Sequence, residues 1–259
     1  MSIYAHFLPE EKPFIDKCLD LLEYVEEHRQ QRQTDFLDPR QATIMTSLSH
    51  RFEQIQVHLD GGYAEAERVR AVVSPFFLKY QESNLGVQLL SVTSSDHIKV
   101  SQLGHGDYLG ALLGLGVKRE KIGDIHTHSW GAHLLVAEEM SAFLNLHLSQ
   151  VGRVNVSTQI VPIVSLQRNE QQWQLSHYIV ASLRLDGVIS EVLGLSRAKV
   201  LPPIQSGRCK VNWKVEDNPS KTIKENDVIS WQGVGRFKIC SIDGLSKKGK
   251  IRLTIGKII

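Results

Sequence analysis

The sequence predicts an α+β protein with three parts: an N-terminal α/β unit over residues 1–78, a middle α/β plait over 79–181, and a C-terminal module over 182–259. An amphipathic helix followed by short strands supports the first part, and a β-α-β-β-α-β order supports the second. In the third part, two helical patterns precede several alternating strands.

The N-terminal unit begins with a charged amphipathic helix predicted over residues 9–33. Thr34 or Asp35 should introduce a turn, and Pro39 suits the first turn of a second helix over residues 41–52. This part of the unit is therefore expected to be helix, turn and helix.

A short strand over residues 55–59 leads to Gly61-Gly62 and a charged run that ends at Arg70. In one interpretation the glycines turn a hairpin into a strand over residues 70–73, and the charges are solvated. In the other, the run contacts a substrate or RNA. The residue pattern alone favours the structural interpretation.

The middle unit follows a polar break at residues 81–84. Its expected elements are a strand near Val87, a helix over 106–115, strands over 122–127 and 132–137, a helix over 138–148 and a strand over 154–162. Trp173, Leu175 and Ile179 are expected to form a strand that closes this domain. Because the aromatic signature of RNA-recognition folds is missing, the sequence of this unit does not itself indicate RNA binding.

The C-terminal module opens with an amphipathic helix predicted over residues 183–193, which Gly194 suits as the left-handed terminating residue. Ser196 fits the N-cap of a second helix. The first turn of that helix carries Arg197 and Lys199, where the helix dipole favours carboxylates by roughly 0.3–1 kcal/mol each. The broken rule indicates that an external phosphate binds there.

A strand is expected after Gly207, because apolar and polar residues alternate. The apolar set is Cys209, Val211, Trp213 and Val215, and the polar set is Arg208, Lys210, Asn212 and Lys214. One strand face should be core and the other cationic. An ordinary half-exposed strand with solvated lysines is the alternative, but the basic helix start beside it favours nucleic acid.

Six motifs in residues 183–257 resemble the S-four domain, a small RNA-binding fold first seen in a bacterial small-subunit ribosomal protein. They are R-L-D-x-x-I, G-L-S-R-x-K, G-R-C-K-V-N-W-K, E-N-D-V-I-S-W, G-R-F-K and K-K-G-K-I-R. Pro202 and Pro203 depart from the pattern. Since proline lacks the N–H and clashes with the preceding turn, the second helix should be short or kinked there.

The resemblance and the basic pattern together predict one rigid cationic face that recognises RNA by shape. The predicted contacts are Arg184, Ser196, Arg197, Lys199, Arg208, Lys210, Asn212, Lys247, Lys248 and Arg252. Charge supports this prediction, because residues 183–259 contain 15 Lys and Arg against 7 Asp and Glu. The rest of the chain contains 15 against 21.

Three further runs resemble the bacterial YlmH family, whose members end in an S-four domain. They are FLDPR at 36–40, GGYAEAERVR at 61–70 and LGALLGLGVKREKIGDI at 109–125. The resemblance implies a cytoplasmic protein that binds rRNA or tRNA on the large ribosomal subunit, in rescue or quality control of obstructed subunits carrying peptidyl-tRNA. It also implies secondary RNA contacts at Arg68, Arg70, Lys118, Arg119 and Lys121.

The run from Asp124 to Ser129, with His126, His128 and the nearby His133, is the most enzyme-like in the chain. Two imidazoles two residues apart on a strand could bind one metal, as in metal-dependent hydrolases. Such enzymes need a larger barrel with further ligands, and only about 55 residues remain before the C-terminal module. We therefore predict no metal, no cofactor and no catalytic residue.

Composition is consistent with this prediction. Cys18, Cys209 and Cys240 form no disulfide or zinc pattern, which favours a reducing compartment. The chain lacks a membrane-length apolar run and a signal-peptide pattern, so we expect a cytoplasmic protein. We also expect it to be a monomer. An RNA-modifying enzyme of the pseudouridine synthase or methyltransferase type is the alternative function, but its catalytic Asp loop and its donor-binding glycine loop are not found.

Overall fold

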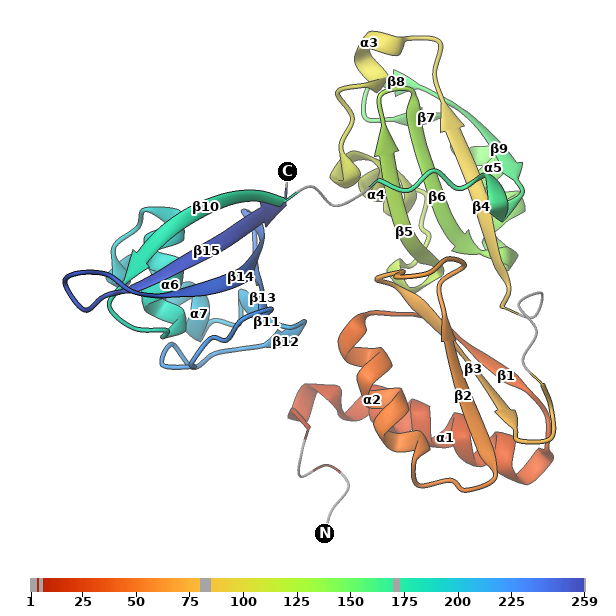
Figure 1. Ribbon diagram of the computed structural model, residues 1–259. Coiled ribbons are helices and arrows are strands. Elements are labelled where there is room, and N and C mark those ends of the chain that lie inside the picture. Colours follow the sequence, from red (N-terminus) through yellow and green to blue (C-terminus); the bar gives the residue numbers. More distant parts are fainter. Residues whose placement is uncertain (1–3, 5–6, 80–84, 170–172, 259) are drawn as a thin grey trace. The chain divides into compact units, whose positions relative to one another are not determined.

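The computed structural model describes residues 4, 7–79, 85–169 and 173–258, and the fold class is α+β as predicted. The chain forms two compact units, Met1–Asn169 and Glu170–Ile259 (Figure 1). The predicted polar break at 81–84 lies outside the described residues. None of the described helices combines the length and apolar character needed to cross a membrane.

The first unit begins with two helices packed on a three-stranded antiparallel sheet of order β1-β3-β2. Its elements are η2 (Pro9–Glu11), α1 (Lys12–His28), β1 (Arg32–Leu37), α2 (Pro39–Ser49), β2 (Ile55–Asp60) and β3 (Val69–Pro75). Ile15 and Leu22 from α1 meet Met45 from α2 in the core. Asp38 caps α2 by accepting a hydrogen bond from the N–H of Gln41.

The predicted helix over residues 9–33 is too long, and the segment around Thr34 and Asp35 is part of strand β1 rather than a turn. Helix α1 ends at His28, and Arg29 adopts the left-handed conformation. Strand β1 is largely polar and half-exposed, so its own pattern does not identify it. Its pairing with β3, which is distant in the sequence, determines the strand.

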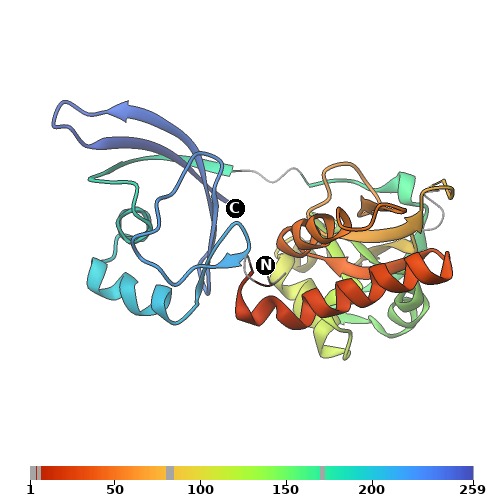
Figure 2. The ribbon, with the colours of Figure 1, turned by 90° about the horizontal axis from the view of Figure 1, so that it is seen from below.

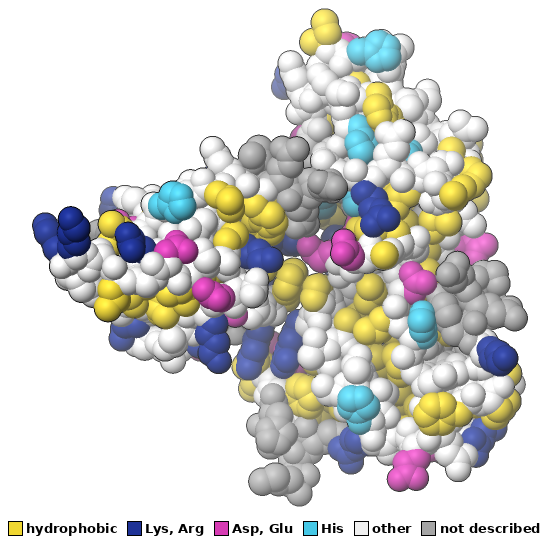
Figure 3. All heavy atoms as spheres, viewed as in Figure 1, with side chains coloured by type: hydrophobic (Ala, Val, Ile, Leu, Met, Phe, Trp, Pro, Cys, Tyr) yellow, Lys and Arg dark blue, Asp and Glu magenta, His cyan; other side chains and the backbone are white. Residues whose placement is uncertain are grey.

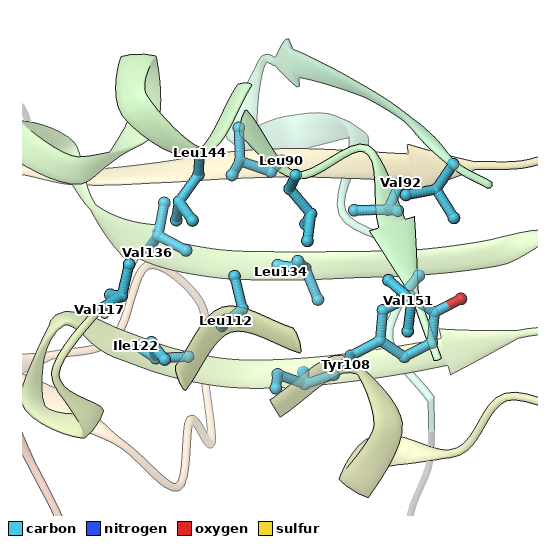
Figure 4. Packing of buried hydrophobic residues seen from close by; sticks show 14 of the residues in the cluster. Leu90, Val92, Tyr108, Leu112, Val117, Ile122, Leu134, Val136, Leu144 and Val151 are labelled. Atoms are coloured by element: carbon cyan, nitrogen blue, oxygen red, sulfur yellow. The ribbon is translucent and has the colours of Figure 1, made fainter. Parts of the chain in front are cut away.

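A second sheet in the same unit has the antiparallel order β5-β6-β4-β9, which is the predicted α/β plait. Its elements are β4 (Val87–Thr93), α3 (His97–Val100), α4 (His105–Gly114), η4 (Arg119–Lys121), β5 (Ile122–His128), β6 (Gly131–Ala137), α5 (Glu138–His147), β7 (Gln150–Val151), β8 (Val154–Asn155), β9 (Ser157–Val161) and η5 (Ile163–Ser165). Tyr108 and Leu112 of α4 pack on Leu134 and Val136 of β6 (Figure 4).

The second unit is a six-stranded sheet of order β10-β15-β14-β13-β11-β12 with two helices on one face (Figure 2). Its elements are β10 (Trp173–Val180), α6 (Leu185–Leu193), α7 (Arg197–Gln205), β11 (Cys209–Val211), β12 (Lys214–Val215), β13 (Val228–Trp231), β14 (Gly235–Leu245) and β15 (Ile251–Ile258). Val188 and Val200 from the helices share the core with Phe237, Leu253 and Ile255.

One prediction for this unit needs correction. The strand of Trp173, Leu175 and Ile179 does not close the middle domain, because β10 pairs along its whole length with β15. Helix α7 is short, as predicted, with nine residues, and Pro202 and Pro203 lie inside it. The carbonyls of the two prolines still accept hydrogen bonds from the N–H groups of Ser206 and Arg208, which closes the helix.

Candidate nucleic-acid interface

The turn between α6 and α7 is where the sequence predicts a phosphate site. Gly194 ends α6 with a φ of 61°, and Ser196 is the N-cap of α7 without a side-chain hydrogen bond to the helix. Ser196, Arg197 and Lys199 are all exposed. Because the first N–H groups of a helix have no partner within it, an anion here would meet those groups and two cations.

Arg197 also lies against α6. A Cβ added to Gly187 would stand 3.0 Å from Nη2 of Arg197, so the guanidinium packs over this glycine. The hydrogen bond from Arg184 lowers the pKa of Asp186, and Arg197 adds to that effect. The starts of the two helices therefore form one cationic edge, here called the helix edge and defined as Arg184, Ser196, Arg197 and Lys199.

Arg184 is engaged by an internal carboxylate. Its Nε and Nη2 donate to the two carboxylate oxygens of Asp186 at 3.0 and 2.9 Å. Asp186 is 4% exposed, whereas the side chain of Arg184 is 43% exposed. The pairing therefore fixes the orientation of the guanidinium while part of it still faces solvent.

The predicted strand over residues 209–215 is instead a tight hairpin. Strands β11 and β12 pair with each other, and Asn212 and Trp213 form the turn with φ values of 51° and 63°. Trp213 is thus in a turn and does not continue the core face. The sequence pattern alternates through the turn without a break, so the pattern alone does not reveal the hairpin.

Asn212 has internal partners on both ends of its amide. Its Nδ2 donates to Asp227, and its Oδ1 accepts from the N–H of Val228. The amide therefore ties the hairpin turn to the start of β13, and as placed here it has a structural role.

The outer face of the C-terminal sheet, opposite α6 and α7, carries a second set of cations. Cys209 and Val211 are buried on the helix side, so Lys210 between them points outward. The same alternation turns Arg236 and Lys238 of β14 outward around the buried Phe237. The outer sheet face is defined here as Lys210, Arg236, Lys238 and Arg252.

The remaining predicted contacts lie at strand ends and in a turn. Arg208 is exposed directly before β11, and Lys247 and Lys248 are exposed in the turn that joins β14 to β15. Lysine and arginine side chains gather around this hairpin tip (Figure 3).

The prediction of one single cationic face is wrong. The helix edge and the outer sheet face lie on opposite sides of one sheet.

Sequence reasoning missed Arg236 and Lys238 as candidate contacts. The signal was present in the sequence, because a basic residue stands on either side of Phe237 in a strand pattern. It becomes useful only once the register places Arg236 and Lys210 opposite the same residue, Ser230.

Most of the predicted secondary RNA contacts form hydrogen bonds or ion pairs within the first unit. Arg68 donates to the carbonyls of Phe36 and Ile122 at 3.0 and 2.9 Å. Arg70 is 3% exposed and donates to the carbonyls of Thr34 and Gly86. Arg70 is therefore unavailable to RNA in this structure, whereas Arg68 is partly exposed and its contact with RNA stays a prediction.

The remaining three secondary contacts differ in exposure. Lys121 pairs with Asp35 at 2.6 Å and with Glu139 at 2.7 Å, and hydrogen bonds to both raise the pKa of Lys121. Arg119 donates to the carbonyl of Ile122 at 2.6 Å. Lys118 is exposed and stays a candidate contact.

Asp124, part of the enzyme-like run, holds the loop between β2 and β3. Its carboxylate accepts from the hydroxyl of Tyr63 at 2.7 Å and from the N–H groups of Glu67 and Arg68 at 2.8 and 3.1 Å. Burial and the nearby Asp124 carboxylate both raise the pKa of Tyr63. Asp124 therefore connects the two sheets of the first unit.

The side chains of His126, His128 and His133 bind the backbone of the segment that follows β9 and keep it on the plait sheet. Nδ1 of His126 accepts from the N–H of Asn169 at 3.1 Å, and Nδ1 of His133 accepts from the N–H of Gln167 at 3.0 Å. His128 contacts the carbonyl of Gln167 at 3.1 Å through Nε2. Both Nδ1 acceptors fix the neutral Nε2–H form of their rings.

These contacts give the histidines a structural role. Burial lowers the pKa of both His126 and His133, which favours the neutral form of their rings. Within residues 7–79, 85–169 and 173–258, no three His, Cys, Asp or Glu side chains lie together as metal ligands. The geometry of the three histidines therefore supports hydrogen bonding to the backbone.

The structure defines a modular α+β protein with exposed cations on its second unit. Residues 10–76 match the family described as "YlmH, N-terminal", and residues 81–165 match "Putative RNA-binding domain in YlmH". The chain belongs to the YlmH family, as its three sequence runs predicted. The S-four assignment concerns residues beyond these two matches and stays a prediction.

A curated relative and a solved structure agree with the family assignment. The chain is 35% identical over 253 residues to "Ribosome-associated protein quality control protein P2" of Bacillus subtilis, covering 98% of this chain and 97% of the relative. It also resembles the structure of "Cell division protein ylmH from Streptococcus pneumoniae", with a TM-score of 0.55 and 23% identity. That match covers 63% of this chain and 98% of the other, and it supports the fold.

Proposed function

We propose that this protein is a cytoplasmic, monomeric RNA-binding protein that acts on the ribosome without catalysing a reaction. In this proposal it binds rRNA or tRNA on the large subunit, in rescue or quality control of obstructed subunits carrying peptidyl-tRNA. The ribosome-associated quality-control name of the Bacillus subtilis relative supports the cellular role. In this proposal the C-terminal unit is an S-four domain and contains the main RNA-binding surface.

The observation that carries the proposal is the N-terminus of α7. Ser196 leaves the helix end without a side-chain cap, and Arg197 and Lys199 are exposed in the first turn. A phosphate would satisfy the helix N–H groups and both cations at once. Arg208 and the Lys247-Lys248 turn would add phosphate contacts around the same RNA.

The proposal is tested by replacing Arg197 and Arg208 with Ala and measuring binding to structured RNA at several salt concentrations. The slope of log affinity against log salt should flatten by roughly 0.7–0.9 for each phosphate that the variant no longer neutralises. Lys99→Ala is the control, because it removes an exposed cation from the first unit. An unchanged slope in the double variant would exclude the helix edge as the RNA site.

Association with the ribosome needs its own measurement. The full chain should sediment with large subunits and crosslink to their RNA, and the Arg197 and Arg208 double variant should be released at lower salt. Sedimentation with small subunits alone, or with neither subunit, would contradict the ribosomal part of the proposal.

The alternative is an RNA-modifying enzyme that uses the C-terminal unit as an anchor. The test is incubation of the protein with bulk RNA and a methyl donor, followed by analysis of the nucleosides. A modified nucleoside formed only with the protein would favour the enzyme. We expect the RNA to be recovered unchanged.

A further inference from the structure

The outer sheet face contains a row of polar and basic side chains that the register aligns. Lys210 of β11 lies opposite Ser230 of β13, and Ser230 lies opposite Arg236 of β14. Lys238 follows two residues along β14 on the same face. This row lies across the sheet from the helix edge, so one stretch of RNA bound at the helix edge does not account for it.

Two indole rings accompany these cations. The guanidinium carbon of Arg236 lies 5.7 Å from the ring centroid of Trp213. Gly256 stands opposite Lys238, and a Cβ there would approach the Cβ of Trp173 to 2.9 Å. The glycine therefore leaves the space that Trp173 occupies on this face. Both tryptophans are only partly buried.

The backbone of Trp213 indicates that this side chain has a role beyond the turn. A two-residue hairpin turn with both φ values positive favours Asn-Gly, and here Trp213 takes the glycine position with a φ of 63°. A bulky residue is sterically disfavoured in that conformation. Its Nε1 is enclosed and has no hydrogen-bond partner among the described residues. Neither the turn nor an internal hydrogen bond requires an indole there.

We propose that the outer sheet face binds single-stranded RNA, with bases stacked on Trp213 and Trp173 and phosphates held by Lys210, Arg236 and Lys238. A positive groove with aromatic rings suits unpaired nucleotides, because every base has a face that can stack. An acidic peptide would use the cations but gain little from the indoles. The inference rests on the proposed function for its ligand class, and it adds a second RNA segment on the opposite side of the unit.

The test compares two RNAs of equal length, an unpaired oligouridylate and a hairpin, binding to the full chain. Trp213→Gly should keep the fold, since glycine suits the positive φ, and the thermal midpoint checks this. Its affinity for oligouridylate should fall about tenfold, because one base no longer has a ring to stack on. Its affinity for the hairpin should stay unchanged, and Trp213→Phe, which keeps an aromatic ring, should retain most of the oligouridylate binding.

A charge-matched pair of double variants separates the two surfaces. Arg236→Ala with Lys238→Ala should flatten the salt slope for oligouridylate by roughly 0.7 for each phosphate no longer neutralised. Arg197→Ala with Lys199→Ala removes the same charge and should weaken the hairpin instead. Equal losses of affinity for both RNAs in both double variants would overturn the inference, because they would indicate only general attraction of charge.

Other outcomes separate this inference from the proposed function. If the wild-type protein binds the hairpin but not oligouridylate, or if Trp213→Gly folds and binds oligouridylate as before, the outer-face inference fails alone. If neither RNA binds, the proposed function fails as well. Polyglutamate binding that falls in Trp213→Gly as much as RNA binding would make the face a protein-binding surface and would also overturn the inference.

Discussion

Several cations of the two compact units have opposite roles. In the first unit, Arg68 and Arg70 point inward and donate to backbone carbonyls, while Lys121 pairs with carboxylates. In the second unit, Arg197 and Lys199 are exposed at a helix start. The residue types are the same, and their surroundings decide whether they stabilise the fold or present charge to a partner.

The surroundings differ in a way that physical chemistry explains. A buried guanidinium is tolerated only when carbonyls or carboxylates satisfy its N–H groups, and the two sheets of the first unit supply them. Residues 183–259 have 7 Asp and Glu for 15 Lys and Arg, so most cations there meet few internal carboxylates. Arg184 with Asp186 is an exception that fixes the position of one guanidinium.

The largest expected effect comes from removing an inward-facing arginine. Arg70→Ala should destabilise the first unit by about 3 kcal/mol, because the carbonyls of Thr34 and Gly86 lose their buried donor. RNA affinity of the second unit should not change. Amide hydrogen exchange of strand β3 measures the first quantity, and RNA titration measures the second.

Lys118→Ala is the matched control, since Lys118 is an exposed cation of the same unit. It should leave exchange in β3 within about 0.5 kcal/mol of the wild-type value. A loss of RNA affinity in Arg70→Ala while β3 stays protected would break the comparison between the units.

The next effect concerns the carboxylate that holds the loop between β2 and β3. Asp124→Asn should cost about 2 kcal/mol, because Asn has one acceptor oxygen where the carboxylate accepts three hydrogen bonds. Exchange of the amides of Glu67 and Arg68 should rise. Unchanged exchange at these two amides would show that other contacts hold the loop.

The division between inward and outward cations is only partly predictable from the sequence. The exposed cations at the start of α7 are predictable because two basic residues break a helix-dipole rule locally. For Arg68 and Arg70 the residue pattern favours a structural role and the family resemblance implies RNA contacts, and the sequence cannot decide because their partners Phe36, Thr34 and Gly86 are distant in the chain. A local pattern shows that a charge exists, whereas tertiary partners decide where it points.

The fold shows the same limit. The plait is predictable because each of its main strands and helices has a clear period, as in the alternation over residues 132–137. Strand β1 was missed because its residues are polar and its pairing with β3 is long-range. Strand β10 is predictable as a strand but not as part of the C-terminal sheet, because the sequence around it contains no signal of its pairing with β15.

The buried histidines of the first unit should make its stability depend on pH. Burial lowers the pKa of His126 and His133 below the ordinary 6.5, so the unfolded chain binds protons that the folded unit excludes. Stability should be complete above about pH 6.5 and fall as the pH drops below it, by at most ~1.4 kcal/mol per pH unit for each histidine. Exchange in β6 at several pH values measures the change.

Replacing His126 and His133 with Gln should remove most of this pH dependence, because the amide oxygen can still accept from the backbone and does not titrate in this range. His177→Gln is the control, as that histidine is exposed in the second unit. An equally steep fall in the double variant would assign the pH dependence to other groups.

The smallest effect sharpens the comparison at the helix edge itself. Gly187→Ala should stabilise α6 by up to ~1 kcal/mol through helix propensity, because the nearest atoms to the new Cβ belong to the movable end of Arg197, at 3.0 Å. The displaced guanidinium should then bind structured RNA more weakly, by less than Arg197→Ala does. Chemical denaturation and RNA titration of the same preparation measure both effects. Stability and binding would thus change in opposite directions, as expected where a cation is positioned for a partner. A parallel gain in both would mean that Arg197 contributes to the fold rather than to RNA binding.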